Sequence, residues 1–214
     1  MWIDVISVFI GYLLGSIPSA YIAGRLVKGV DIRQVGGRNM GTLNTMREIG
    51  TVAGVAVLIA DIAKGALGVL VAQWLSASTI AVLIAGFAAI IGHNCPVFLK
   101  FRGGKGAATA LGVFLALAPA ATGISLAVIV IIIIATSNFT LALAGGFLLM
   151  PLILWLFREI SFRETNTIIY FTLVVAAFLA IRYIPTLKRA LTDPEARKNV
   201  FIERRYRPWQ SRKK

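Results

Sequence analysis

A glycine-lysine turn is the part of the sequence best suited to binding an anion. The segment Gly92–Gly106 holds the only histidine, His93, and the only cysteine, Cys95, and it ends in the Gly103–Gly106 turn around Lys105. Glycines let a backbone approach a ligand closely, and the first N–H groups of a helix have no intrahelical partner. An apolar, helix-like run follows directly, so the turn predicts a phosphate seat at a helix N-terminus. A plain loop whose lysine marks the cytoplasmic side of a membrane is the other interpretation.

A polar segment earlier in the chain, Lys28 to Gly50, is rich in hydrogen-bond donors. In chain order it is the first polar segment, and Gly92–Gly106 is the second. Its centre carries glycines, asparagines and arginines: Gly36, Gly37, Arg38, Asn39, Gly41, Asn44 and Arg47. Arginine offers forked donors, asparagine an amide donor, and glycine an unshielded N–H group, a combination that suits an oxyanion. Because a plain connection between two helices can be much shorter, we interpret this segment as a binding element in preference to a solvated loop.

Two apolar runs contain ionisable residues. Asp61 and Lys64 lie three positions apart in one run, and His93 lies near the end of the next. Asp61 and Lys64 share a helical face and are expected to pair, either as a structural ion pair or as part of a ligand site. A lone histidine in an apolar run is more often a hydrogen-bonded structural residue than a metal ligand. With no second histidine and no carboxylate cluster, we expect no metal site and no cofactor.

Composition places the chain in a membrane. Hydrophobic residues make up 58% of its 214 residues, against about 45–50% in soluble domains, and the mean hydropathy is +0.83. The chain is too short for a second large domain, so we expect one all-α, polytopic bundle of about seven transmembrane helices. The apolar segments are Ile3–Arg25, Thr51–Leu75, Thr79–Phe98, Gly106–Ala118, Ala120–Ala135, Leu141–Phe157 and Thr167–Tyr183.

The first apolar run has its own packing signals. Gly11, Gly15 and Ser19 recur every four residues, which suits close helix packing, and Pro18 predicts a kink. The fourth run is only about a dozen residues long before Pro119, so it is either a half-helix or a short tilted helix.

Charge distribution predicts the topology. The net charge of +13 comes from Lys and Arg residues that gather in a few loops and at the C-terminus, which indicates cytoplasmic loops and not nucleic-acid binding. We expect the N-terminus outside, the C-terminus inside, a membrane domain at 1–187 and a basic cytoplasmic tail at 188–214. The tail would lie on the anionic inner leaflet, with Trp209 as an interfacial anchor, or be disordered. A single cysteine excludes an intramolecular disulfide.

Three positively charged elements, the Arg33–Arg47 segment, the Lys64 end of its helix and the Gly103–Gly106 turn, are thus predicted to face one compartment. They indicate a membrane-surface site for phosphorylated molecules. Several blocks resemble the bacterial acyl-phosphate:glycerol-3-phosphate acyltransferase family, in order and at that family's spacing: Gly15-Ser16-Ile17-Pro18-Ser19, Asp31-Ile32-Arg33, Asn39-Met40-Gly41, Asn44 with Arg47, Asp61-Ile62-Ala63-Lys64-Gly65, and Gly92-His93 through Pro96-Val97-Phe98 to Phe101–Gly112.

The resemblance implies a seven-helix enzyme of the bacterial inner membrane. Such enzymes transfer a fatty acyl group from acyl phosphate to the sn-1 hydroxyl of glycerol 3-phosphate, in phospholipid biosynthesis, and use no acyl-CoA or acyl carrier protein directly. The products are lysophosphatidic acid and phosphate. The resemblance places Asn39, Asn44, Arg47, Lys105 and the Gly103–Gly106 turn at phosphate-binding positions, and Lys64 and His93 at motif positions of the family. We predict catalytic roles for Lys105, Arg47 and Asn39, and substrate binding by Gly103, Gly104, Gly106, Asn44, Arg38, Lys64 and His93. Arg38, which the family pattern lacks, is included for its positive charge. The implied partners are the two substrates and membrane lipid, with no oligomeric state assigned.

The sequence departs from the family pattern at polar positions. Gly37, Leu143, Tyr183 and Thr186 stand where the family carries serine, serine, histidine and asparagine. Losing one aimed donor can cost roughly 10²–10³ in rate. Two alternatives therefore accompany the acyltransferase prediction: a non-catalytic or transport-like membrane paralogue that binds a phosphometabolite or phospholipid, and an acyltransferase for another phosphorylated acceptor.

Overall fold

The computed structural model describes residues 1–156 and 165–192 of the chain, and its regular elements there are helical. In chain order they are α1 (Trp2–Ser16), α2 (Ser19–Lys28), the 3-10 turn η1 (Ile32–Gln34), α3 (Thr42–Glu48), α4 (Thr51–Trp74), α5 (Thr79–Asn94), the 3-10 turn η2 (Val97–Leu99), α6 (Ala107–Leu117), α7 (Pro119–Thr136), α8 (Phe139–Leu156) and α9 (Thr165–Thr192). Five segments are long and apolar enough to span a membrane, and α6 and residues Leu141–Leu156 are shorter apolar helices. The predicted all-α membrane bundle is confirmed.

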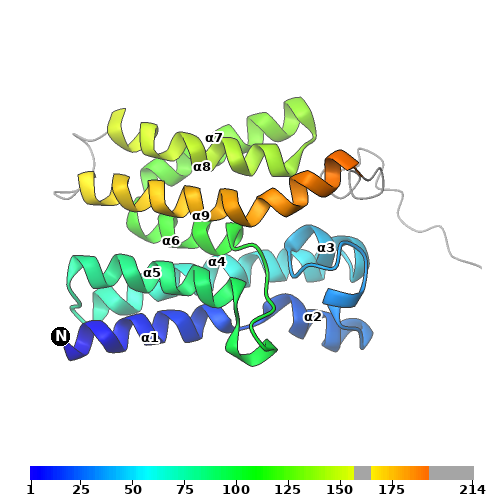
Figure 1. Cartoon of the computed structure of the whole chain (residues 1–214), viewed down its shortest axis with the longest axis horizontal. Helices are drawn as coiled ribbons and strands as arrows, with labels where there is room; N and C mark the ends of the chain where they lie inside the picture. The colour runs from blue at the N-terminus through cyan, green and yellow to red at the C-terminus, as the bar shows by residue number, and fades with distance from the viewer. Residues whose placement is uncertain (157–164, 193–214) are drawn as a thin grey trace, which may run out of the picture.

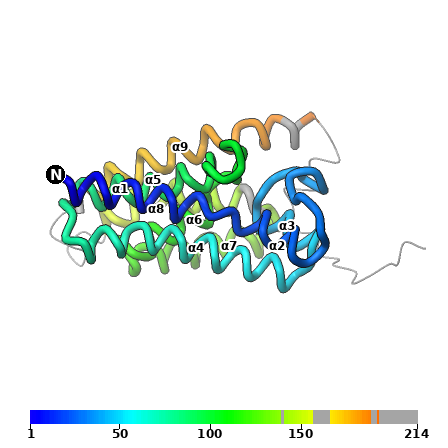
Figure 2. Tube along the Cα trace, turned by 90° about the horizontal axis from the view of Figure 1, so that it is seen from below, coloured from blue at the N-terminus to red at the C-terminus, as the bar shows by residue number. Residues whose placement is uncertain are grey.

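The bundle consists of two groups of helices joined by α6. Helix α1 packs on α4 and α5, whereas α7 packs on α8 and α8 on α9. Helix α6 contacts α4, α5, α7 and α9, so it lies between the groups (Figure 1). The N-terminus lies at one end of the long axis, and α2, α3 and the C-terminal end of α9 lie at the other (Figures 1 and 2). The first polar segment and the C-terminal end of α9 therefore share one end of the bundle.

The kink predicted at Pro18 is a complete break between two helices. Helix α1 ends at Ser16, Ile17 adopts φ −58° and ψ 117°, and Pro18 precedes the first residue of α2. Proline lacks an N–H group and disfavours helical geometry in the residue before it, which accounts for the break. The break leaves the Ile17 carbonyl outside the helical hydrogen-bond ladder.

Small residues bring neighbouring helices into backbone contact. A Cβ atom at Gly11 or Gly15 would overlap the carbonyls of Ala85 and Ala89 on α5. The close packing predicted for this face of α1 is confirmed at both glycines, and Ser19 lies beyond the break, in α2. Such close approach is typical of membrane helices, whose association relies on van der Waals packing.

The fourth apolar segment is a short helix with a buried aromatic side chain. Helix α6 has 11 residues, and α7 begins at Pro119, in accord with the proline. Phe114 of α6 is 1% exposed. The centroid of its ring lies 6.1 Å from that of Phe147 on α8 and 5.9 Å from that of Phe171 on α9. This packing fixes α6, whose N-terminus follows the glycine-lysine turn.

Two regions contain more helix than the apolar pattern indicated. The polar segment before Thr51 includes η1 and α3, and α9 continues through Pro185 to Thr192. The predicted division between residues 187 and 188 thus falls within a helix. Most of the loop 158–166 and residues 193–214, with Trp209, lie outside the described residues.

Candidate functional site

The glycine-lysine turn folds back onto the end of α5. The Gly103 N–H donates to the Asn94 carbonyl at 3.1 Å, and the Gly104 N–H donates to the His93 carbonyl at 3.0 Å. Gly106 then adopts φ +90° as the residue before α6, a conformation that favours glycine. Because the Gly103 and Gly104 amides already have protein acceptors, the anion-binding potential of the turn lies in the amides at the start of α6.

A buried cluster of charges lies beneath the turn. Lys64 Nζ is 2.8 Å from Asp61 Oδ1, so the predicted pairing of these residues is confirmed. His93 Nδ1 lies 3.6 Å from the same carboxylate oxygen, and Lys64 also donates to the Ile17 carbonyl at 2.9 Å, at the break between α1 and α2. The imidazole packs directly under Gly104, since a Cβ atom there would overlap His93 Nε2.

Helix α9 also contacts the turn. Arg182 Nη2 donates to the Gly104 carbonyl at 3.2 Å. Lys105 Nζ lies 4.8 Å from the centroid of the Tyr183 ring, within cation–π distance. Residues 78 positions apart in sequence thus meet at the turn, and Lys105 is oriented in part by an aromatic ring.

The first polar segment is organised by the side chain of Asn44. Its Oδ1 accepts from the Gly37 N–H at 2.7 Å, and its Nδ2 lies 2.9–3.3 Å from the carbonyls of Asn39, Ile32 and Val35. Asn39 Oδ1 in turn accepts from the Gly41 N–H at 2.7 Å. Asn44 is buried and engaged with the loop backbone, so its geometry fits shaping the loop better than contacting a phosphate.

Arg33 pairs with Asp31 inside this segment and also connects it with the second. Arg33 Nη2 lies 2.7 Å from Asp31 Oδ2, and the Arg33 hydrogen bond holds the pKa of the Asp31 carboxyl below its usual value. Asp31 likewise raises the pKa of Arg33. Arg33 Nη1 donates to the Leu99 carbonyl at 3.4 Å, in η2. The two polar segments are therefore in contact through Arg33 and Leu99.

The structure places the predicted site residues in two groups. Gly103, Gly104, Lys105 and Gly106 form the turn, His93 packs against it, and Lys64 lies one step further away, paired with Asp61. Arg38, Asn39, Asn44 and Arg47 belong to the first segment, where Arg38 is exposed and Arg47 lies half-buried in the last turn of α3. Arg33 and Leu99 provide one contact between the two polar segments, and phosphate binding by these residues stays a prediction.

Sequence reasoning did not assign site roles to Asn94, Arg182 or Tyr183. Asn94 is 1% exposed, and its carboxamide oxygen and nitrogen have no hydrogen-bond partner within the described part of the chain. It lies beside Gly106 at the start of α6. Its position directly after His93 was a usable signal, whereas the Arg182 and Tyr183 contacts depend on how α9 packs. Among the described residues, no group of three or more His, Cys, Asp or Glu is placed to hold a metal ion.

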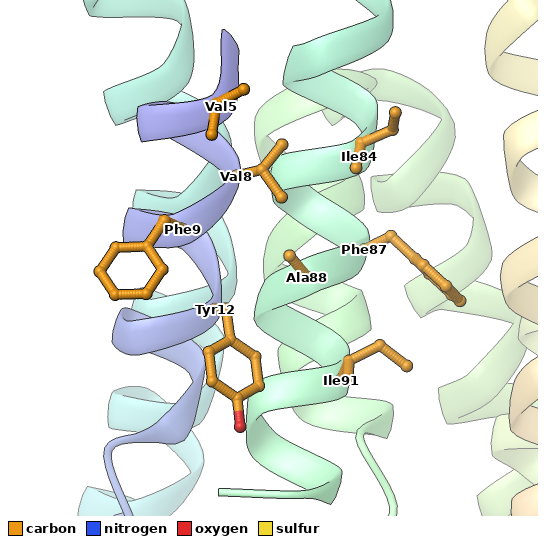
Figure 3. Close-up of a pocket in the computed structure, with 8 residues that line it drawn as sticks. All are labelled: Val5, Val8, Phe9, Tyr12, Ile84, Phe87, Ala88 and Ile91. Carbon is orange, nitrogen blue, oxygen red and sulfur yellow. The ribbon is translucent and has the colours of Figure 1, made fainter. Parts of the chain in front are cut away.

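An apolar recess of about 460 Å³ runs between α1 and α5 (Figure 3). Its lining residues are Val5, Val8, Phe9, Tyr12, Ile84, Phe87, Ala88 and Ile91. At one end, the Tyr12 hydroxyl donates to the carbonyl of Cys95, the residue that follows α5, at 2.9 Å. The recess therefore leads from the apolar face of the bundle to the edge of the polar site.

These features define a multi-pass integral membrane protein with an anion-suited polar site at its helix ends. The chain matches the family model described as glycerol-3-phosphate acyltransferase over residues 5–193. It is 41% identical to glycerol-3-phosphate acyltransferase 1 of Dehalococcoides mccartyi over 208 residues, covering 94% of this chain and 98% of that protein. It is 37% identical to glycerol-3-phosphate acyltransferase 2 of Moorella thermoacetica over 195 residues, covering 91% and 96%.

The fold is similar to that of a solved acyltransferase. Two crystal structures of PlsY, described as an integral membrane glycerol 3-phosphate acyltransferase, match with TM-scores of 0.78 and 0.77 and 31% identity, covering 88% of this chain and 92% of PlsY. One is the lysophosphatidic acid form and the other the glycerol 3-phosphate form. This chain belongs to the glycerol-3-phosphate acyltransferase family, and the family predicted from the sequence motifs is confirmed.

Proposed function

We propose that this protein acylates glycerol 3-phosphate at its sn-1 hydroxyl, with acyl phosphate as donor, to form lysophosphatidic acid. Family membership and the likeness to PlsY in forms with glycerol 3-phosphate and lysophosphatidic acid support the acceptor and the product. The observation that carries the proposal is the turn at the start of α6, where Lys105 and the helix N-terminus meet beside the Arg182 contact.

The phosphate groups of both substrates would bind where positive charge and backbone amides coincide. Lys105 and the first amides of α6 form one such place, because a helix N-terminus and a cation both favour an anion. Arg47, Arg38 and Asn39 of the first segment form the second. Asn44, Gly103 and Gly104 would serve this site by shaping the backbone, since their polar groups are bonded to the protein itself.

Acyl transfer from acyl phosphate needs little covalent help from the protein. The sn-1 oxygen attacks the carbonyl carbon, a new C–O bond forms, and the bond from that carbon to the phosphate oxygen breaks. Asp61 and His93 face each other beneath the turn, and we do not assign either of them as the general base. The hydroxyl proton passes instead to a phosphate oxygen of the substrate. Catalysis then depends on orientation and on electrostatic stabilisation of the developing charge.

We assign the site to the cytoplasmic face of a bacterial inner membrane. Support comes from the positive residues at the end of the bundle that carries α2 and α3, and from Lys100, Arg102 and Lys105 of the second segment. Positively charged loops are retained on the cytoplasmic side during insertion.

The test is an assay of purified protein with acyl phosphate and glycerol 3-phosphate. We expect lysophosphatidic acid from the wild type, with kcat/KM reduced by about 10²–10³ in K105A. The proposal fails if no product forms, or if K105A and the wild type turn over equally well. Complementation of a strain that lacks its own acyltransferase tests the same function in a cell.

The variants G37S and Y183H test whether the departures from the family pattern limit the reaction. A large gain in turnover with glycerol 3-phosphate would show that these positions weaken an acyltransferase. Unchanged turnover in an active enzyme would show that Gly37 and Tyr183 are compatible with full activity. Product from a different phosphorylated acceptor, in place of glycerol 3-phosphate, would correct the acceptor.

A further inference from the structure

A polar connection crosses the apolar bundle beneath the Gly103–Gly106 turn. It begins at the Ile17 carbonyl, which accepts from Lys64 at 2.9 Å. Lys64 Nζ pairs with Asp61 Oδ1 at 2.8 Å, and His93 Nδ1 lies 3.6 Å from that oxygen. The opposite edge of the imidazole, at Nε2, packs against the backbone of Gly104. One row of side chains thus extends from the break between α1 and α2 to the turn.

The charges in this connection are costly to bury. Asp61 and Lys64 are 2% and 5% exposed, and ionised groups are seldom buried this deeply unless paired. The helices around them also pack through glycines: Gly65 of α4 lies against the Thr109 carbonyl, and Gly112 of α6 against the Ile62 carbonyl. These glycines already allow α4 and α6 to pack closely. The buried ion pair is therefore not needed to hold these two helices together.

Gly104 is held on three sides. The His93 carbonyl accepts its N–H at 3.0 Å, the His93 ring lies under its Cα, and Arg182 donates to its carbonyl at 3.2 Å. Lys105 follows directly, and Gly106 opens α6. A displacement of Gly104 would therefore move both the lysine and the first amides of the helix.

We propose that Asp61, Lys64 and His93 are positioning residues that set the height and orientation of the phosphate-binding turn. The His93 ring supports Gly104, and the Asp61–Lys64 pair fixes that ring relative to the break at Ile17. In this role Lys64 and His93 act on the substrate through the turn, without touching it. The inference rests on the proposed acyl transfer for its ligand, while the arrangement itself can be tested without turnover.

Two substitutions of His93 separate the edges of its ring. In H93Q the amide reaches the position of Nε2 and keeps contact with Gly104. In H93N the amide reaches only the position of Nδ1, near Asp61. We expect H93N to raise KM for acyl phosphate about tenfold or more with a smaller change in kcat, and H93Q to stay within about threefold. Equal KM values in H93N and H93Q, whether unchanged or raised, would overturn the role of the Nε2 edge.

A paired substitution separates positioning from stability. Removing one member of a buried ion pair strands a charge, whereas replacing both with apolar groups of similar size is often neutral for stability. We therefore expect D61L/K64M to keep the unfolding temperature of the wild type in detergent while KM for acyl phosphate rises about tenfold. K64M alone should lower the unfolding temperature. Wild-type KM in a stable D61L/K64M protein would overturn the role of the ion pair.

Inorganic phosphate provides a readout that does not need catalysis. Ligand binding to the native state raises the unfolding temperature, so we expect phosphate to stabilise the wild type and H93Q more than H93N. Failure of the wild type to form product would defeat the proposed function. The difference in phosphate stabilisation between H93Q and H93N would still test whether His93 positions the turn. Equal phosphate stabilisation in all three proteins would overturn it, even for an active enzyme.

Discussion

The two polar segments of the site are stabilised in opposite ways. The first, residues 31–48, is held from within, because Asn44, Asn39 and the Asp31–Arg33 pair satisfy its own backbone and charges. The second, residues 94–106, is held from outside by the end of α5 and by Arg182 of α9. A short segment can thus be specified locally by its own sequence, or only by the elements packed around it.

The largest effect is expected from a methyl group at Gly104, near the end of the second segment. A Cβ atom in G104A would overlap His93 Nε2 in a buried position, so the turn must move. We expect kcat/KM to fall by about 10²-fold or more, because small displacements of a positioned group are that costly. Steady-state kinetics on purified protein measure the loss.

The matched control is G123A. Gly123 lies in α7, and nothing lies within 4 Å of a Cβ atom placed there. Alanine is the better helix former, so G123A should keep full activity and equal or greater stability. Wild-type kinetics in G104A would show that the turn does not depend on contact with His93.

A smaller and more local effect is expected from the hub of the first segment. N44A leaves the Gly37 N–H and the facing carbonyls of the loop without their buried partner, at a cost of about 1–3 kcal/mol per stranded group. We expect the unfolding temperature to fall and kcat/KM to drop about tenfold. N44D keeps the acceptor for Gly37 but turns a carboxylate oxygen toward the carbonyls of Asn39, Ile32 and Val35, so it should be at least as destabilising as N44A. Stability of N44D close to that of the wild type would place the importance of Asn44 in its acceptor, Oδ1.

The contrast between the segments also explains what the sequence could predict. Hydropathy was sufficient for the seven apolar segments, since burial in lipid requires long apolar helices. The Asp61–Lys64 pair followed from helical spacing alone. Asn44 was picked out by residue type, yet its role as a loop hub depends on backbone geometry that no spacing rule provides.

Other features depended on tertiary packing. The Arg182 contact with Gly104 joins residues 78 positions apart, and only the docking of α9 brings them together. The bonds from Gly103 and Gly104 to the end of α5 use backbone groups, which carry no signature in residue type. The helix α3 was hidden because a polar, seven-residue helix lacks a sustained apolar stripe.

Arg182 tests how much the second segment depends on α9. R182A removes a charged donor from the Gly104 carbonyl while leaving the His93 contacts in place. A hydrogen bond to a charged group contributes roughly 1.5–3 kcal/mol, and the exposure of Arg182 lowers its share, so we expect KM for acyl phosphate to rise by up to about tenfold. R182K keeps a donor and should recover part of the loss. An unchanged KM in R182A would mean that α5 alone holds the turn.

The smallest effect is expected at Asp31, where the first segment carries a pH-dependent contact. The Arg33 hydrogen bond lowers the pKa of the folded-state carboxyl below its unfolded value. Its contribution to stability is therefore present above the unfolded pKa and is lost as the pH falls through the folded pKa. Because Arg33 is 27% exposed, solvent screening should keep this contribution to about 1 kcal/mol or less.

Thermal unfolding of wild type and D31N in detergent, between about pH 2 and pH 7, measures this contact. D31N should be slightly less stable than wild type at neutral pH, and the two proteins should converge as the acid limit is approached. Asp31 and Arg33 lie beside the Leu99 contact that joins the segments, so D31N should also weaken substrate binding slightly. A constant difference in unfolding temperature at every pH would show that the Asp31 side chain contributes through shape and not through its charge.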